Sequence, residues 1–136
     1  MKLIIAGTRT LSDYNWVLKA ISYAEGCDPA LVRSEITEVV HGAARGIDTT
    51  AGIWAQNSGI AVKEFPAKWD DVKAPGAVVR TGKYGPYNAK AGFDRNVEMA
   101  KYGTALLAVI QGGSKGTTHM IETAKQHGLQ VWVYEV

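Results

Sequence analysis

Short apolar runs alternate with helix-type patterns along the whole chain. The apolar runs cover 2–6, 36–42, 60–66, 104–110 and 129–136. Between them, apolar side chains recur every three or four residues over 12–26, 45–59, 91–103 and 117–128. This alternation is typical of an α/β protein whose mainly parallel sheet is covered by helices on both faces. We therefore expect a three-layer sandwich with five parallel strands.

The order of the strands is narrowed by the right-handed crossovers of such folds. We favour the Rossmann-like order 3-2-1-4-5, with the flavodoxin-like order 2-1-3-4-5 as the alternative. The chain has 136 residues, which suits one domain over 1–136. Residues 67–90 carry glycines, prolines and polar side chains without a clear period, so we expect an irregular insertion there.

Helix ends and inward faces can also be predicted. Ser12 and Asp13 both suit the N-cap of the first helix, and Gly128 suits the C-cap of the last. The pair Asp28-Pro29 predicts a short extra helix over 28–35. In the last two helices, the side chains expected to face the core are Phe93, Val97, Ala100, Met120, Ile121 and Ala124.

Composition indicates an ordinary soluble protein. Hydrophobic residues make up 46% and charged residues 21%, and the net charge of +2 does not by itself require nucleic acid. No apolar stretch is long enough for a signal peptide or a membrane span. The single cysteine, Cys27, cannot form an internal disulfide, so we expect a cytoplasmic protein without a membrane partner.

Three glycine-bearing loops follow the first, second and fourth strands. In the favoured strand order they open on the same edge of the sheet, where such folds bind ligands. Glycines let the backbone approach a phosphate, helix N-termini offer free N–H groups, and cationic side chains add charge. The residues expected to bind an anionic ligand are Gly7, Thr8, Arg9, Gly42, Arg45, Gly46, Asp48, Gly112, Gly113, Ser114, Lys115, Gly116, Thr117 and Thr118.

Plain turns are the competing interpretation, because strand-to-helix loops are often glycine-rich for packing alone. Two motifs are also absent from the sequence. There is no G-x-G-x-x-G after the first strand and no G-x-x-x-x-G-K-[ST], which disfavours ordinary dinucleotide binding and P-loop hydrolysis.

Five stretches resemble the SLOG superfamily of Rossmann-like proteins, and within it the small YspA-like group of bacteria and phages. They are "AGTRT", "VVHGAARGIDTTAGIWA", "FPAKW", "AGFDRNVEM" and "GGSKGTTHMIETAKQHG". The resemblance implies a Rossmann-like fold and a nucleotide-derived, phosphate-bearing ligand. ADP-ribose-like molecules and nucleoside monophosphates are the expected classes. The protein would act as a sensor or as a hydrolase of the N-glycosidic or phosphate linkage.

Two related families set the alternatives for chemistry. "GAARGID" resembles the DNA-processing protein A family, which binds single-stranded DNA. "GGSKGT" and "RNVEM" resemble the LONELY GUY phosphoribohydrolases, whose arginine acts with a glutamate of a "PGGxGTxxE" motif. Here Arg95 matches that arginine, Asn96 replaces the following lysine, Gln111 replaces the proline, and Met120 stands where the glutamate would be.

The catalytic pair of those hydrolases is thus only half present. Arg95, with Glu122 or Asp94 as the carboxylate, remains the candidate catalytic set, and Asn96 is expected beside the ligand. No histidine pair has metal-binding spacing, so we expect no protein-bound metal. A Mg²⁺ ion carried by the ligand phosphates stays open.

The insertion over 67–90 interleaves cationic and aromatic side chains. Three interpretations stay open: a mobile lid over an anionic ligand, a single-stranded nucleic-acid surface, and a solvated hairpin that supports a dimer. Single-stranded nucleic-acid binding is therefore the alternative function. Relatives often pair through helices, which favours a homodimer or a higher homo-oligomer.

Overall fold

The computed structural model describes residues 1–28 and 35–136, and its main sheet has five parallel strands. Across the sheet, the strands are β3 (Ala61–Glu64), β2 (Glu38–His41), β1 (Lys2–Gly7), β6 (Ala105–Ile110) and β7 (Gln130–Glu135). Numbered within this sheet alone, the order is 3-2-1-4-5. The predicted Rossmann-like order is therefore confirmed, and the flavodoxin-like alternative is wrong.

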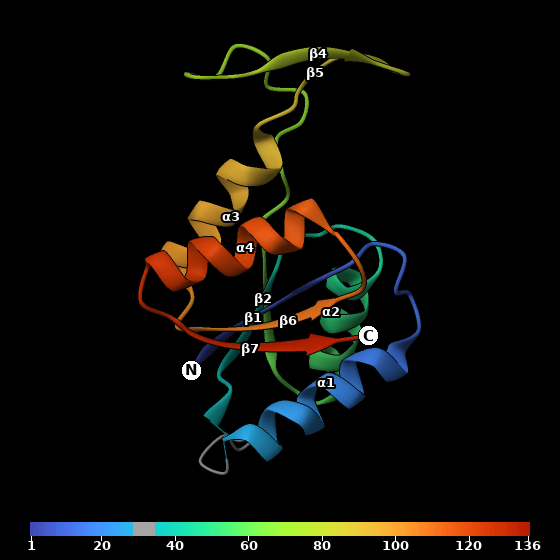
Figure 1. Ribbon diagram of the computed structural model, residues 1–136, viewed down its shortest axis with the longest axis vertical. Helices are drawn as coiled ribbons and strands as arrows, with labels where there is room; N and C mark the ends of the chain where they lie inside the picture. The colour runs from blue at the N-terminus through green and yellow to red at the C-terminus, as the bar shows by residue number, and fades with distance from the viewer. Residues whose placement is uncertain (29–34) are drawn as a thin grey trace.

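Four helices cover the sheet in two pairs (Figure 1). They are α1 (Tyr14–Cys27), α2 (Ile47–Asn57), α3 (Ala91–Tyr102) and α4 (Lys115–Gln126). The first pair packs on one face of the sheet and the second pair on the other. The predicted three-layer sandwich is confirmed. The short helix expected over 28–35 falls almost entirely outside the described residues.

Alternation along the strands divides the core into two layers. Leu3 and Ile5 pack toward α1 and α2, whereas Ile4 and Ala6 pack toward α3 and α4. A strand that is buried on both faces needs an apolar side chain at nearly every position, and this explains the uninterrupted apolar runs. No helix in 1–28 or 35–136 has the length and hydropathy needed to cross a membrane.

The helix ends follow the sequence signals closely. Asp13 caps α1, since its carboxylate accepts a hydrogen bond from the Asn15 N–H at 2.9 Å. Helix α4 begins at Lys115, two residues earlier than expected. Its C-cap is His127, and Gly128 follows with a φ of 76°, a left-handed conformation that glycine adopts without strain.

The predicted inward face of α3 is wrong at Phe93. This side chain is 42% exposed, and its ring stacks on His119 of α4 with a centroid separation of 4.1 Å. Met99 and Asn96 occupy the buried face instead. The Asn96 amide bonds the His119 Nδ1 at 3.1 Å, so polar and aromatic contacts between α3 and α4 accompany the apolar packing of Met99 with Met120. Two other side chains that we expected in the core, Val97 and Ile121, are only partly buried.

The segment 67–90, expected as an irregular insertion, contains a two-stranded antiparallel hairpin, and a hairpin was one of the three interpretations left open for it. Its strands are β4 (Val79–Gly82) and β5 (Gly85–Asn88). The hairpin stands apart from the main sheet, beyond the first turn of α3 (Figure 1). All four residues of β4 are exposed, so no buried face imposes an alternation of apolar and polar side chains on this strand.

Candidate functional site

A cavity opens where the chain leaves β1 and β6. These neighbouring strands pair in parallel, with Gly7 opposite Val109. After β1 the chain turns to the α1 face, and after β6 it turns to the α4 face, so the two loops part. The gap is a cavity of about 350 Å³, which we call the sheet-edge cavity. It lies at the topological switch point, where open α/β sheets bind ligands.

Ten of the predicted site residues line this cavity together. They come from the loops after β1 and β6, from the starts of α2 and α4, and from α3. They are Gly7, Thr8, Arg9, Asp48, Arg95, Asn96, Gly113, Ser114, Gly116 and Thr117. The structure therefore brings these ten residues together around one cavity. What these residues do there stays a prediction.

The loop glycines divide into two groups by the space around them. A β-carbon at Gly7 would lie 2.5 Å from the Val109 carbonyl oxygen, and one at Gly46 would lie 2.4 Å from the Arg9 carbonyl oxygen. These two glycines serve close packing of the chain on itself. Added β-carbons at Gly113 and Gly116 would meet nothing within 4 Å. These two leave open space beside the cavity, as an approaching ligand requires.

The first turn of α4 has free backbone donors. Ser114 is its N-cap, but no side chain caps the helix, because the Ser114 hydroxyl donates instead to the Thr117 hydroxyl at 3.0 Å. The loop before it is held in place, since the Gln111 N–H donates to the Thr8 hydroxyl at 3.0 Å. Uncapped N–H groups at a helix start favour an anion.

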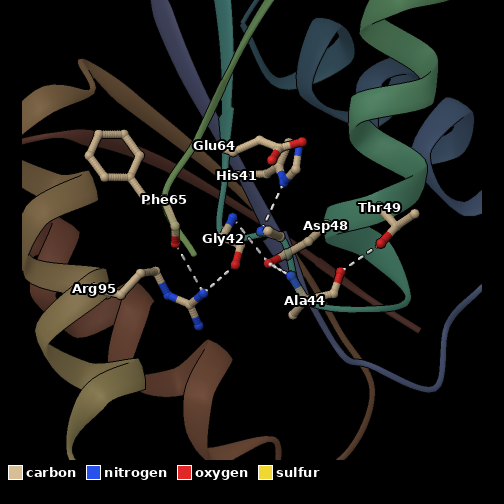
Figure 2. Close-up of polar contacts among 9 residues, drawn as sticks. His41, Gly42, Ala44, Asp48, Thr49, Glu64, Phe65 and Arg95 are labelled. Atoms are coloured by element: carbon tan, nitrogen blue, oxygen red, sulfur yellow. Dashed lines mark hydrogen bonds and ion pairs between the residues drawn. The ribbon is translucent and has the colours of Figure 1, made fainter. Parts of the chain in front are cut away.

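Asp48 and Arg95 hold the loop after β2 from opposite sides (Figure 2). One carboxylate oxygen of Asp48 accepts from the N–H groups of Gly42 at 3.2 Å and Ala44 at 3.3 Å. The Arg95 Nη1 donates to the Gly42 carbonyl at 2.5 Å, and the Arg95 Nε donates to the Asn96 side chain at 3.1 Å. Both side chains also line the sheet-edge cavity.

The charges at the cavity influence one another. Burial raises the pKa of Asp48 to about 6, although Arg95, the N–H groups of Ala44 and Gly42, and Arg9 oppose the shift. Burial also lowers the pKa of Arg95, and the charge of Arg9 acts in the same direction while Asp48 opposes it. An arginine stays protonated in proteins. Two guanidinium groups therefore face a single carboxyl group that titrates near pH 6, and the cavity favours anions.

A second cavity, of about 270 Å³, adjoins the first and is called the loop cavity here. Its lining includes Arg9, Gly42, Arg45, Trp69 and Arg95. The guanidinium of Arg9 lies over the Trp69 ring, 5.8 Å from its centroid. Arg9 and Arg45 thus line one cavity, whereas Lys115, which we expected beside them, does not line it.

Other predicted site residues lie outside these cavities. Gly46, Gly112, Lys115, Thr118 and Glu122 line none of the cavities described, and Asp94 lines a different one with Lys68 and Glu98. Asp94 pairs with Lys90 at 3.7 Å on the helix surface.

The position at which the LONELY GUY motif has its glutamate faces the sheet-edge cavity. Met120, which stands there, lines the sheet-edge cavity. Among the described residues that line this cavity, Asp48 is the one with a carboxylate.

The histidines near the site have structural partners. The His41 Nδ1 accepts from the Ala43 N–H at 2.9 Å, and burial lowers the pKa of this ring. Burial also lowers the pKa of His119, which bonds to Asn96. In 1–28 and 35–136, no group of three or more His, Cys, Asp or Glu side chains is arranged to hold a metal ion.

Trp69 lies at the site but was not among the residues predicted to bind a ligand, and the same holds for Thr10, Ala44, Gln111 and Met120. Trp69 lines the loop cavity and contacts Arg9. Its place in "FPAKW", immediately before the basic and aromatic insertion, was the available signal. A periodicity argument could not find it, because residues 67–70 lie outside any helix or strand.

An open parallel sheet with a cavity at its switch point defines a Rossmann-like α/β protein. A family profile described as YAcAr, the YspA, cpYpsA-related SLOG family, matches residues 1–71, so the chain belongs to this family. No curated protein and no solved structure matches the chain. The matched segment contains Arg9, Arg45, Asp48 and Trp69, and it ends before the hairpin.

Proposed function

We propose that this protein binds a nucleotide-derived, phosphate-bearing ligand, either an ADP-ribose-like molecule or a nucleoside monophosphate, in the sheet-edge cavity. One observation carries the proposal: the uncapped start of α4 and the guanidinium groups of Arg9 and Arg95 surround the same cavity. Membership of a SLOG family is consistent with such a ligand. A Mg²⁺ ion arriving with the phosphates fits this proposal.

Calorimetric titration tests the phosphate requirement directly. Wild-type protein is titrated with AMP, with ADP-ribose, and with adenosine as the control that lacks phosphate. We expect saturable binding of at least one phosphate-bearing ligand and none of adenosine. Equal binding of adenosine, or no heat from either phosphate ligand at millimolar concentration, would rule the proposal out.

Sensing and hydrolysis are two versions of this function. If the ligand is turned over, Asp48 is the carboxylate best supported as the acid or base, because it lines the cavity and its pKa is raised to about 6. Glu122 and Asp94 have weaker support, since neither lines that cavity. Chromatography after incubation separates the two versions: a released base or phosphate, lost in Arg95→Ala, indicates a hydrolase.

Single-stranded nucleic acid is the second candidate ligand. The observation that favours it is the exposed hairpin tip, where Tyr84 is 94% exposed beside Lys83. Exposed aromatic rings with cations suit stacked bases and a phosphate backbone. Fluorescence anisotropy with labelled oligonucleotides at low and high salt tests it, and binding should weaken steeply with salt. The expected homodimer is tested separately by light scattering after size exclusion.

A further inference from the structure

A larger cavity lies under the hairpin. It measures about 720 Å³ and is called the hairpin cavity here. Its lining includes the aromatic side chains Trp69, Tyr84 and Tyr87 and the cationic side chains Arg80 and Lys83. Arg9 reaches it from the loop after β1, and the one carboxylate among the described residues of its lining is that of Asp70. Flat rings with an excess of positive charge favour an anionic molecule that carries an aromatic ring.

The hairpin cavity connects to the sheet-edge cavity through a smaller one. This bridging cavity, of about 260 Å³, shares Arg95, Asn96 and Gly116 with the sheet-edge cavity. It shares Arg9, Trp69 and Ala89 with the hairpin cavity. These shared wall residues place the sheet-edge and hairpin cavities along one path, with the Arg9 guanidinium and the Trp69 ring between them.

The wall that carries Trp69 is bonded to the base of the hairpin and contacts helix α3. The Asn88 N–H donates to the Trp69 carbonyl at 2.6 Å, and the Ala89 N–H donates to the Val78 carbonyl at 2.7 Å. A β-carbon at Gly92 would lie 3.0 Å from the Trp69 ring, so the ring rests against the first turn of α3. An aromatic surface held in this way is available for stacking without first being ordered.

We propose that the hairpin cavity is a second subsite, for a nucleobase, and that the ligand class is therefore a dinucleotide whose two nucleosides are joined through phosphates, bound without the G-x-G-x-x-G loop of ordinary dinucleotide sites. The phosphates lie at the sheet-edge loops and Arg9, and the second base stacks on Trp69. This rests on the proposed function and narrows it. The sheet-edge cavity alone is near the lower limit of ligand sites, whereas the connected path accommodates a longer molecule.

The test compares two ligands that differ only in the second base. Diadenosine diphosphate carries adenine where ADP-ribose carries a hydroxyl, and the diphosphate is the same. Since stacking of a base on an aromatic side chain contributes about 1–3 kcal/mol, the second adenine should tighten binding by about 5- to 150-fold. Both ligands are titrated into wild-type protein and into the variants below by calorimetry.

The variants separate stacking from general damage. Trp69→Leu should remove the gain from the second adenine, so that the ratio of the affinities of this variant for the two ligands falls to about 1, and Trp69→Phe should retain most of the gain. The matched control is Trp16→Leu, because Trp16 lies on α1 with Lys19 over its ring at 4.8 Å and lines none of the cavities described. This control should change neither affinity. Circular dichroism confirms that each variant is folded.

The possible outcomes distinguish failure of the second subsite from failure of the proposed function. Equal affinity of wild type for the two ligands would overturn the second subsite and leave the proposed function standing. Absence of binding by both would overturn the proposed function as well. A gain that survives Trp69→Leu would place the second base elsewhere and also overturn the inference. Tighter, steeply salt-dependent binding of an oligonucleotide would assign the hairpin to nucleic acid instead.

Discussion

The guanidinium of Arg95 occupies the space that a side chain on Gly42 would need. A β-carbon at position 42 would lie 2.2 Å from the Arg95 Nη1 and 2.9 Å from a carboxylate oxygen of Asp48. The same Nη1 donates to the Gly42 carbonyl at 2.5 Å. Because position 42 is a glycine, the Arg95 guanidinium can lie against it and hold the loop after β2 close to α3.

Gly42→Ala should destabilise the protein and weaken ligand binding together. The added methyl group must displace Arg95 or Asp48, and overpacking of this kind costs about 1–3 kcal/mol. Urea unfolding measures the loss, and titration with ADP-ribose measures the binding. The matched control is Gly26→Ala in α1, where an added β-carbon meets nothing within 4 Å and should stabilise the helix by about 0.5–1 kcal/mol. Equal stability of the two variants would contradict the crowding at Gly42.

Asp48→Asn should change how stability depends on pH. The pKa of Asp48 is raised from 3.8 to about 6, so the folded state binds this proton more tightly than the unfolded state does. Its contribution to stability is therefore complete below about pH 4 and is lost as the pH rises through about 6. Relative to Asp48→Asn, wild-type protein should lose on the order of 3 kcal/mol over that range.

Urea unfolding of both proteins between pH 4 and pH 7.5 checks the pH dependence. Asparagine keeps an oxygen for the Gly42 and Ala44 N–H groups, so the loop retains its acceptor. The histidines titrate in both proteins, and their contributions cancel in the difference. A difference that stays constant with pH would show that the folded protein leaves this carboxyl pKa unchanged.

Arg9→Ala should weaken binding of a phosphate-bearing ligand far more than Lys115→Ala. Arg9 lines the sheet-edge, loop, bridging and hairpin cavities, whereas Lys115 lines none of them. A hydrogen bond to a charged group contributes about 1.5–3 kcal/mol, which corresponds to roughly 10- to 150-fold in affinity. Calorimetry with ADP-ribose measures both variants. Equal losses would mean that the phosphate lies at the exposed side of α4.

Asn88→Ala should release the hairpin from the body of the protein. Asn88 is 2% exposed, and its side-chain oxygen accepts from the Val78 N–H at 3.2 Å and the Lys90 N–H at 3.0 Å. Leaving buried donors unpaired costs about 1–3 kcal/mol each. Hydrogen exchange should accelerate over β4 and β5 while the main sheet stays protected. Unchanged protection of the hairpin amides would refute this role of Asn88.

The sequence was sufficient to predict the sheet and its edge. Two-sided burial forces apolar residues at nearly every strand position, as at Leu3 to Ala6, and this pattern is readable without a structure. Once the strand order was chosen, the loops with Arg9, Asp48 and Gly113 had to meet at the carboxyl edge. Topology therefore predicted the cavity, because it depends on connections and not on side-chain detail.

Contacts between distant elements were beyond such reasoning. Phe93 has the spacing of a core residue on α3, but His119 of α4 offers a ring to stack on, and that pairing requires the packed structure. Lys115 was expected to face the ligand. The direction of its side chain depends on where α4 begins, and the helix begins at Lys115 itself. The Trp69 ring contacts Gly92 and Arg9, which lie far from it in sequence, so its position could not be predicted from local pattern.

The hairpin is joined to the rest of the chain through a narrow base at Trp69, Val78 and Asn88. Strands β4 and β5 pair with each other and with no strand of the main sheet, so we expect changes in their length to leave the pairing of the main sheet intact. If the hairpin carries the second subsite proposed above, exchange of this one peripheral segment changes the ligand preference of a Rossmann-like scaffold. Grafting hairpins of different length and aromatic content between Trp69 and Asn88 would then alter selectivity.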